Sequence, residues 1–211
     1  MKEHLLKYWK KTALIKDKKL IEAFKKVNRE NFVLEEDKPK AYGDYPLNIG
    51  YEQTISQPTT VMLMTQALEL KEGNKVLEVG TGSGYQAAII SELIGNKGKV
   101  YTTEIVNELV KLATDNIKKA KIKNIEIIKK DGSSGLKKFA PYDRIIVTAA
   151  CPKIPDGLIE QLNSNGILIA PVGPLYMQEM LKLIKKEDGS LEKTSLGHFI
   201  FVPLKGENGY L

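Results

Sequence analysis

The residues of this sequence best suited to bind a ligand surround a glycine-rich turn. An apolar run, Lys75–Val79, leads into glycines at positions 80, 82 and 84, and a second apolar stretch follows. Gly80 and Gly82 let the backbone turn sharply and approach a ligand without a Cβ atom in the way. A strand, a glycine turn and a helix in this order predict a ligand site at the carboxyl end of the strand. The alternative is a tight turn that binds nothing.

A carboxylate follows this turn at the spacing that Rossmann-like folds use to bind ribose hydroxyls. The predicted strand Lys99–Glu104 ends in Glu104, about 20 positions beyond the last glycine of the turn. We therefore predict that Glu104 binds the ribose of a nucleoside cofactor. The alternative is an exposed carboxylate at the end of a strand.

The charge beside the turn favours a cationic cofactor over a dinucleotide. Dinucleotide folds use G-x-G-x-x-G/A to bring a pyrophosphate to a helix N-terminus, whereas here the third glycine comes early, at Gly84. Glu78 would repel a pyrophosphate but attract the sulfonium and ammonium groups of S-adenosylmethionine. The loop resembles motif I of methyltransferases, which convert this cofactor to S-adenosylhomocysteine. In this chain Asp131-Gly132 follows the strand Ile125–Lys129, which is the place where such methyltransferases hold the adenine ring. Taken alone, an Asp-Gly pair could equally be an ordinary turn. The predicted cofactor-binding residues are Glu78, Gly80, Thr81, Gly82, Ser83, Glu104, Asp131 and Gly132.

A second segment, residues 41–58, carries a more specific resemblance. It reads AYGDYPLNIGYEQTISQP and resembles the signature of protein-L-isoaspartate O-methyltransferases, with the Thr-Ile-Ser-Gln-Pro of that family intact at residues 54–58. Residues 79–85, 142–150 and 152–155 also match the family pattern. Because these motifs extend over most of the chain, it is identified as a member of the protein-L-isoaspartate (D-aspartate) O-methyltransferase family.

This resemblance implies a protein repair enzyme. Enzymes of this family transfer a methyl group from S-adenosylmethionine to the free α-carboxylate of L-isoaspartyl residues in damaged proteins and peptides. The ester then closes to a succinimide, which reopens partly to normal aspartate. A substrate carboxylate is already ionised near pH 7, so the reaction needs no general base and depends on positioning.

The resemblance also assigns roles to residues of the substrate site. It implies that Ser56 lies beside the methyl-transfer centre as the catalytic residue, although a serine before Pro58 could instead cap a helix. The implied substrate-binding residues are Thr54, Ile55, Ser56, Val147, Thr148 and Ala149. The sequence departs from the family at Lys205, Tyr210 and Asn28, where many relatives have threonine, glutamine and proline, which leaves the C-terminal cofactor contacts open.

The elements needed to position these residues alternate between helix and strand. Helices are predicted at residues 18–27, 59–70, 86–94, 107–120 and 157–161, and strands at 75–79, 99–104, 125–129, 142–148 and 166–170. Residues 34–58 form a long ordered connection, and extended runs at 179–185 and 197–204 flank Asp188-Gly189 as a hairpin.

This order predicts an α/β, Rossmann-like class I methyltransferase fold, a mostly parallel sheet with a C-terminal antiparallel hairpin. We expect one methyltransferase domain over residues 1–211. Residues 1–57 contribute the N-terminal helix and active-site loop, 58–175 the cofactor-binding core, and 176–211 the hairpin and tail.

Composition narrows the partners and the compartment. The net charge is +6, but Arg29 and Arg144 are the only arginines, which favours solvated surface lysines over nucleic-acid binding. A single cysteine, Cys151, and the separated His4 and His198 predict no disulfide framework and no structural metal. Lysines interrupt the apolar residues at the N-terminus, so we expect no secretory signal, no membrane association and a cytoplasmic location, with isoaspartyl proteins and peptides as partners and no obligate protein partner.

Three other functions fit parts of the sequence. A class I methyltransferase acting on RNA or a small molecule would share the glycine turn, but amino methyltransferases carry Asn/Asp-Pro-Pro-Tyr/Phe where this chain has Thr-Ala-Ala-Cys-Pro at residues 148–152. A noncatalytic RNA- or protein-binding module would have lost affinity for S-adenosylmethionine. An NAD-dependent dehydrogenase is the third alternative.

Overall fold

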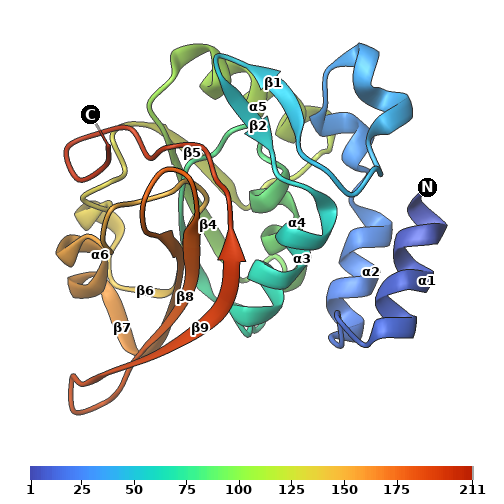
Figure 1. Ribbon diagram of the computed structural model, residues 1–211. Helices are drawn as coiled ribbons and strands as arrows, with labels where there is room; N and C mark the ends of the chain where they lie inside the picture. The colour runs from blue at the N-terminus through green and yellow to red at the C-terminus, as the bar shows by residue number, and fades with distance from the viewer. Residues whose placement is uncertain (211) are drawn as a thin grey trace.

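A seven-stranded sheet forms the centre of the protein, for which a computed structural model describes residues 1–210. The strand order is β5-β4-β3-β6-β7-β8-β9 (Figure 1). The strands are β3 (Lys75–Val79), β4 (Lys99–Glu104), β5 (Ile125–Lys129), β6 (Tyr142–Val147), β7 (Leu162–Val172), β8 (Gln178–Lys185) and β9 (Leu191–Phe199). Strands β3 to β7 pair in parallel, whereas β8 and β9 are antiparallel. The predicted α/β fold with a C-terminal antiparallel hairpin is therefore confirmed.

Helices cover both faces of this sheet. On one face, Val76 and Ile146 contact a cluster formed by Met64 of α3 (Pro58–Ala67) and Ile90 of α4 (Tyr85–Ile94). On the other face, Leu158 of α6 (Asp156–Glu160) belongs to a cluster with strand residues of β3, β6 and β7. The helices are α1 (Lys2–Thr12), α2 (Lys18–Lys26), α3 (Pro58–Ala67), α4 (Tyr85–Ile94), α5 (Asn107–Lys119) and α6 (Asp156–Glu160).

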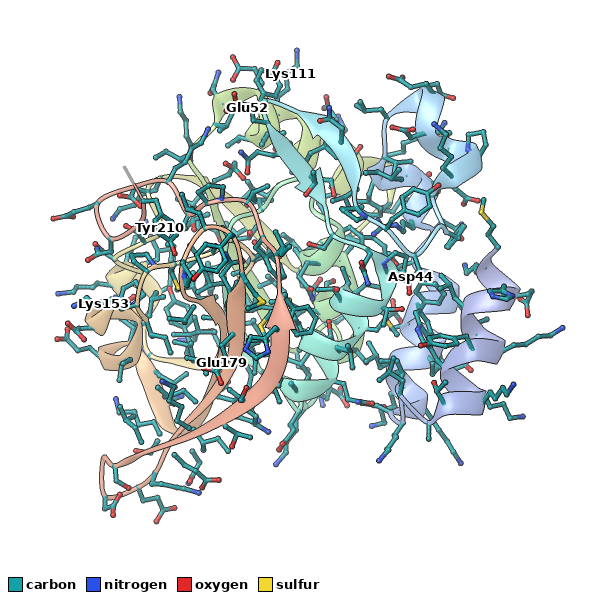
Figure 2. All side chains as sticks on the ribbon, viewed as in Figure 1. Asp44, Glu52, Lys111, Lys153, Glu179 and Tyr210 are labelled. Carbon is teal, nitrogen blue, oxygen red and sulfur yellow. The ribbon has the colours of Figure 1, made fainter. Side chains whose placement is uncertain are left out.

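Two short strands lie within the connection between α2 and α3. After the 3₁₀ turns η1 (Arg29–Phe32) and η2 (Glu35–Lys40), strands β1 (Leu47–Gly50) and β2 (Gln53–Ile55) pair as an antiparallel hairpin. Tyr51 and Glu52 form its tip, both with positive φ, and Figure 2 shows Glu52 at an outer edge of the molecule. The sequence predicted an ordered connection here but not the hairpin.

The C-terminal hairpin differs from the prediction in its second strand. The sequence predicted an extended run over residues 197–204, but β9 begins at Leu191 and ends at Phe199. Residues 191–196 of β9, the edge strand of the sheet, are exposed on both faces and, apart from Leu191 and Leu196, are polar. This stretch therefore lacks the apolar alternation by which a half-buried strand is recognised.

The N-terminal helices pack against the core through few apolar side chains. Leu5 and Trp9 are the buried residues of α1, and the ring of Trp9 lies 4.8 Å from that of Phe24 in α2, centroid to centroid. The prediction began only at α2, since two buried residues among interspersed lysines form too short a stripe to be recognised. No helix within residues 1–210 is long and apolar enough to cross a membrane.

Candidate active site

The turn between β3 and α4 requires glycine at its first position. Gly80 has a φ of 100°, and a Cβ added there would lie 2.4 Å from Thr148 Oγ1. That hydroxyl donates to the carbonyl oxygens of Val79 at 3.0 Å and Gly80 at 2.5 Å. Strand β6 therefore fixes the turn from the side through Thr148.

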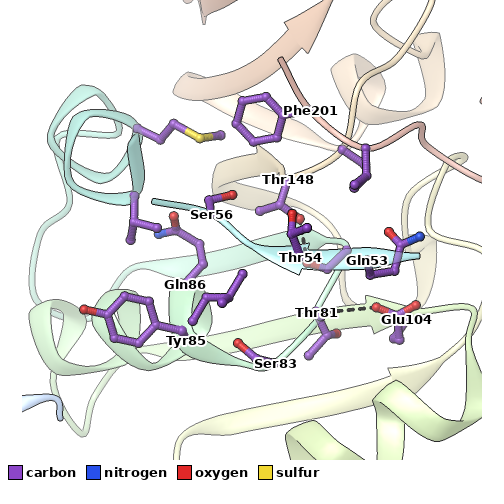
Figure 3. A pocket seen from close by; sticks show the side chains of 17 residues that line it. Gln53, Thr54, Ser56, Thr81, Ser83, Tyr85, Gln86, Glu104, Thr148 and Phe201 are labelled. Carbon is purple, nitrogen blue, oxygen red and sulfur yellow. Dashed lines mark hydrogen bonds between the residues drawn. The ribbon is translucent and has the colours of Figure 1, made fainter. Parts of the chain in front are cut away.

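Glu104 holds the opposite side of the turn at the end of β4. Its Oε2 accepts the backbone N–H of Gly82 at 2.9 Å (Figure 3). Its Oε1 accepts the backbone N–H groups of Ile105 and Val106 at 2.9 and 3.0 Å. The residue is nearly buried but lines the cavity beside the turn. A carboxylate offers about four lone-pair positions, so one more hydroxyl can donate to it.

Glu78 lies behind the turn rather than in the cavity wall. It is fully buried, and Thr102 Oγ1 donates to its Oε2 at 2.5 Å, while that hydroxyl also lies 2.7 Å from Thr81 Oγ1. Its Oε1 has no hydrogen-bond partner among the described residues. Burial raises the pKa of Glu78 to about 8, the hydrogen bond from Thr102 opposes this, and the charge of Glu104 adds to it.

One cavity gathers most of the predicted site residues between the turn, the β1–β2 hairpin and the end of β6 (Figure 3). It brings together Thr54, Ile55, Ser56, Gly80, Thr81, Gly82, Ser83, Glu104, Thr148 and Ala149. Val147 is buried in the sheet and lines neither this cavity nor its neighbours. Among residues 1–210, no lysine or arginine side chain lines this cavity, so its charge favours a cation.

An adjoining cavity contains Gly132 but not Asp131. Gly132 faces β4, where an added Cβ would lie 2.0 Å from Thr103 Oγ1. The Asp131 carboxylate accepts the backbone N–H groups of Ser133 and Glu207, each at 2.8 Å. Although partial burial opposes the effect, these bonds hold the pKa of Asp131 below its usual value. Asp131 thus anchors the C-terminal tail, and its contact with adenine stays a prediction.

A third and larger cavity opens on the other side of Ser56. Its volume is about 660 Å³, within the usual range for ligand sites. Thr54, Ser56 and Thr148 line both this cavity and the one beside the glycine turn. Figure 3 shows these three side chains close together. Two ligands, one in each cavity, would therefore meet at these hydroxyls.

Ser56 reaches this position through contacts of its backbone and of the following helix. Arg29 Nη2 donates to the Ser56 carbonyl at 2.8 Å. The N-cap of α3 is Gln57, so the alternative role of Ser56 as the cap is wrong. Instead, Asp44 accepts the N–H of Thr59 at 3.0 Å from a distant loop.

Several cavity residues were not predicted from the sequence. Gln53, Gln86 and Phe201 line the cavity beside the turn, and Lys130 and Lys205 line the adjoining one. For Lys130, the signal that could have predicted it was its position directly before Asp131-Gly132. Phe201 lies in the run 197–204 that the sequence predicted as extended, but nothing in that run marks it as a cavity residue.

Cys151, the one cysteine of the sequence, belongs to the core. It is fully buried, its thiol lies 3.4 Å from the Pro171 carbonyl, and burial raises its pKa to about 12. A protonated thiol is a poor nucleophile. Within residues 1–210, no group of three or more histidine, cysteine or acidic residues is arranged to hold a metal ion.

The family model and the sequence relatives that match this chain carry the same family name. A sequence model of the family described as Protein-L-isoaspartate(D-aspartate) O-methyltransferase (PCMT) matches residues 1–209. The chain is 46% identical over 195 residues to a protein-L-isoaspartate O-methyltransferase of Methanococcoides burtonii, covering 92% of this chain and 95% of the relative. It is 50% identical over 188 residues to the protein of that name from Fervidobacterium nodosum, covering 89% and 94%.

Solved structures have the same fold over nearly the whole chain. A crystal structure from Plasmodium falciparum, described as beta-aspartate methyltransferase (PCMT) in complex with S-adenosyl-L-homocysteine, is 29% identical with a TM-score of 0.83, covering 96% of this chain and 97% of that one. A structure named protein-L-isoaspartate O-methyltransferase is 30% identical with a TM-score of 0.87, covering 99% and 67%.

Proposed function

The chain belongs to the protein-L-isoaspartate(D-aspartate) O-methyltransferase family, and we propose that its two joined cavities hold S-adenosylmethionine and an isoaspartyl carboxylate on either side of Ser56. It is an S-adenosylmethionine-dependent enzyme that methylates L-isoaspartyl residues of damaged proteins and peptides and so starts their repair. The observation that carries our assignment of the site is that three hydroxyl-bearing residues, Thr54, Ser56 and Thr148, line both cavities.

The residues beside the glycine turn fit S-adenosylmethionine. Within residues 1–210, the cavity wall contains the carboxylate of Glu104 and no cationic side chain. We propose that Glu104 binds the ribose hydroxyls, that residues 80–83 approach the ligand through their backbone, and that Gly132 lies against the adenine. When bound, the cofactor supplies an activated methyl group on a positively charged sulfur.

Ser56 is proposed to orient the acceptor carboxylate. Its carbonyl is held by Arg29, so the backbone is fixed while the side chain faces both cavities. The hydroxyl of Thr54 offers a further donor on the same wall, and Thr148, Ile55 and Ala149 complete it. Such positioning can lower a barrier by roughly 7 to 11 kcal/mol at best, and an ionised acceptor requires no base.

Apolar side chains near the junction help to exclude water from the reaction. Phe201 and Val202 line both cavities, and Met64 lines the one beside the turn. Removing water strengthens the electrostatic contacts of the bound groups and prevents hydrolysis of the activated methyl donor. We propose that the substrates are isoaspartyl proteins and peptides met in the cytoplasm, without an obligate protein partner.

The test is methyl transfer to two synthetic peptides that differ only in L-isoaspartate or L-aspartate at one position. We expect labelled S-adenosylmethionine to methylate the isoaspartyl peptide alone. Gly80→Asp should abolish cofactor binding, because its side chain would collide with Thr148 and add a negative charge. Ser56→Ala should lower kcat by about tenfold or more while the cofactor still binds.

Ser190→Ala is the matched control. Ser190 lies in the exposed turn between β8 and β9, where its hydroxyl donates to the Asp188 carboxylate at 2.6 Å. Its substitution should leave kcat and KM unchanged. Cofactor binding without methylation of either peptide would contradict the proposal and favour an RNA or small-molecule acceptor.

A further inference from the structure

Arg29 is a fully buried arginine directly behind the wall that carries Ser56. Its Nε donates to the Ala41 carbonyl at 2.7 Å and its Nη2 to the Ser56 carbonyl at 2.8 Å. Its Nη1 has no hydrogen-bond partner among residues 1–210. The guanidinium therefore joins two loops of the site but keeps one donor unsatisfied.

No carboxylate neutralises this charge within salt-bridge distance. None of the ion pairs in the described part of the chain includes Arg29. Burial lowers its pKa, and Tyr85, Tyr42 and Asp44 oppose that shift only in part. The guanidinium carbon lies 4.9 Å from the centre of the Tyr85 ring, a cation–π contact. A buried cation without a counter-ion destabilises a protein, so its presence calls for an explanation beyond packing.

The cavity on the other side of Ser56 lacks the charge that an anionic ligand would need. In the described part of the chain, its lining contains hydroxyl, amide and apolar side chains but no lysine, arginine, aspartate or glutamate. The one titratable residue of that lining is the exposed His198. The acceptor of the proposed function is a carboxylate. Behind the wall, the N-terminus of α3 and Arg29 are two sources of positive potential that act on this carboxylate.

We propose that Arg29 is a positioning residue for methyl transfer, which holds the Ser56 segment by its carbonyl and makes the cavity beside Ser56 select an ionised carboxylate over a neutral group. This inference rests on the proposed function, since it assumes that an isoaspartyl carboxylate enters that cavity. The carboxylate of the substrate in turn acts as a counter-ion for Arg29, so substrate binding offsets part of the free-energy cost of burying the guanidinium.

The test compares two peptides that differ only in charge at the acceptor. One carries the isoaspartyl α-carboxylate and the other carries a primary amide in its place. Their dissociation constants are measured by calorimetry in the presence of S-adenosylhomocysteine, so that no turnover occurs. We expect the wild-type protein to prefer the carboxylate, Arg29→Gln to reduce that preference by about tenfold, and Arg29→Lys to keep most of it.

Arg144 provides a matched control, because it is the other arginine of the chain and is also nearly buried. It donates to the carbonyls of Leu68 and Glu69, just beyond the C-terminal end of α3, whereas Arg29 acts before its N-terminal end. Arg144→Gln should lower the melting temperature but leave the ratio of the two dissociation constants unchanged.

Each outcome decides the matter. Equal weakening of both peptides by Arg29→Gln would show a purely structural role and overturn the proposal, as would a wild-type protein that binds carboxylate and amide equally. Retained preference in Arg29→Lys together with its loss in Arg29→Gln supports it. Failure of the wild-type protein to bind either peptide would instead remove the proposed function, and this inference with it.

Discussion

Glu78 is a buried carboxyl group close to the cofactor turn, and no cation lies within salt-bridge distance of it among the described residues. Since its pKa is raised to about 8, the folded protein keeps it protonated at neutral pH, whereas the unfolded chain releases this proton near pH 4.5. Below pH 4.5 both states carry the proton, so Glu78 adds no pH dependence there. Between about pH 4.5 and 8, rising pH favours the unfolded state.

Glu78→Gln should remove this pH dependence. Glutamine has nearly the same shape and stays neutral, so the variant should gain stability relative to the wild-type protein by about 1.4 kcal/mol for each pH unit between pH 5 and pH 8. Urea unfolding of both proteins at pH 5, 6.5 and 8 measures the difference. Parallel stability curves for the two proteins would show that Glu78 is ionised in the folded state.

The sequence predicted well which residues lie near the site, but it did not predict in which direction their side chains point. Ser56, Thr54 and Gly80 were predicted from their motifs and meet at one cavity. Glu78 and Asp131 were predicted as cofactor contacts, but the first lies behind the turn and the second holds the tail. A buried strand is apolar on both faces, so its sequence does not show toward which face a carboxylate points.

Helix α3 depends on a carboxylate from outside the helix for its first turn. Its N-cap residue makes no side-chain capping bond. Asp44 accepts both the N–H of Thr59 at 3.0 Å and its hydroxyl at 2.6 Å, and Trp9 donates to that hydroxyl at 2.9 Å. Asp44 lies between the N-terminal helices and α3 (Figure 2). The loop, α1 and the helix that follows Ser56 are thereby joined at one point.

Asp44→Ala should therefore weaken both the helix and the site. Loss of a capping group costs about 1 kcal/mol, and the segment before α3 would lose its fixed position, lowering kcat/KM for the isoaspartyl peptide. Thermal unfolding and steady-state kinetics check the two effects. Asp188→Ala, in the remote β8–β9 turn, is the control and should leave kcat/KM unaltered. Unchanged kinetics in Asp44→Ala would mean that the Ser56 segment is held without this cap.

Elements of the parallel sheet were predicted more accurately than the elements around the site. Strands β3, β4 and β5 have the predicted bounds, because each is a compact apolar run ended by a turn or a polar residue. The β1–β2 hairpin went unrecognised, since its strands are only four and three residues long and its tip lacks an Asn-Gly or Asp-Gly pair. Short strands that gain their stability from packing on the site leave little local signal.

The N-terminal helices share one core with the cofactor-binding helices. A single cluster contains Trp9 of α1, Phe24 of α2, Ile49 of the hairpin, Met62 of α3 and Ile89 of α4. We propose on this basis that the chain is one cooperative domain. The sequence predicted a single domain, but neither chain length nor the order of elements reveals whether an N-terminal extension packs on the core.

Trp9 makes this proposal testable, because it is the only tryptophan of the chain and is fully buried in α1. Its fluorescence reports the N-terminal helices, whereas far-ultraviolet circular dichroism is dominated by the whole α/β core. If the chain unfolds as one unit, both signals should give the same urea midpoint and slope. Adding S-adenosylhomocysteine should then raise both midpoints equally, because a ligand that binds only the folded state stabilises every part that unfolds with it. A fluorescence transition that comes first and ignores the ligand would instead make residues 1–26 a separate unit, docked beside the site without sharing its stability.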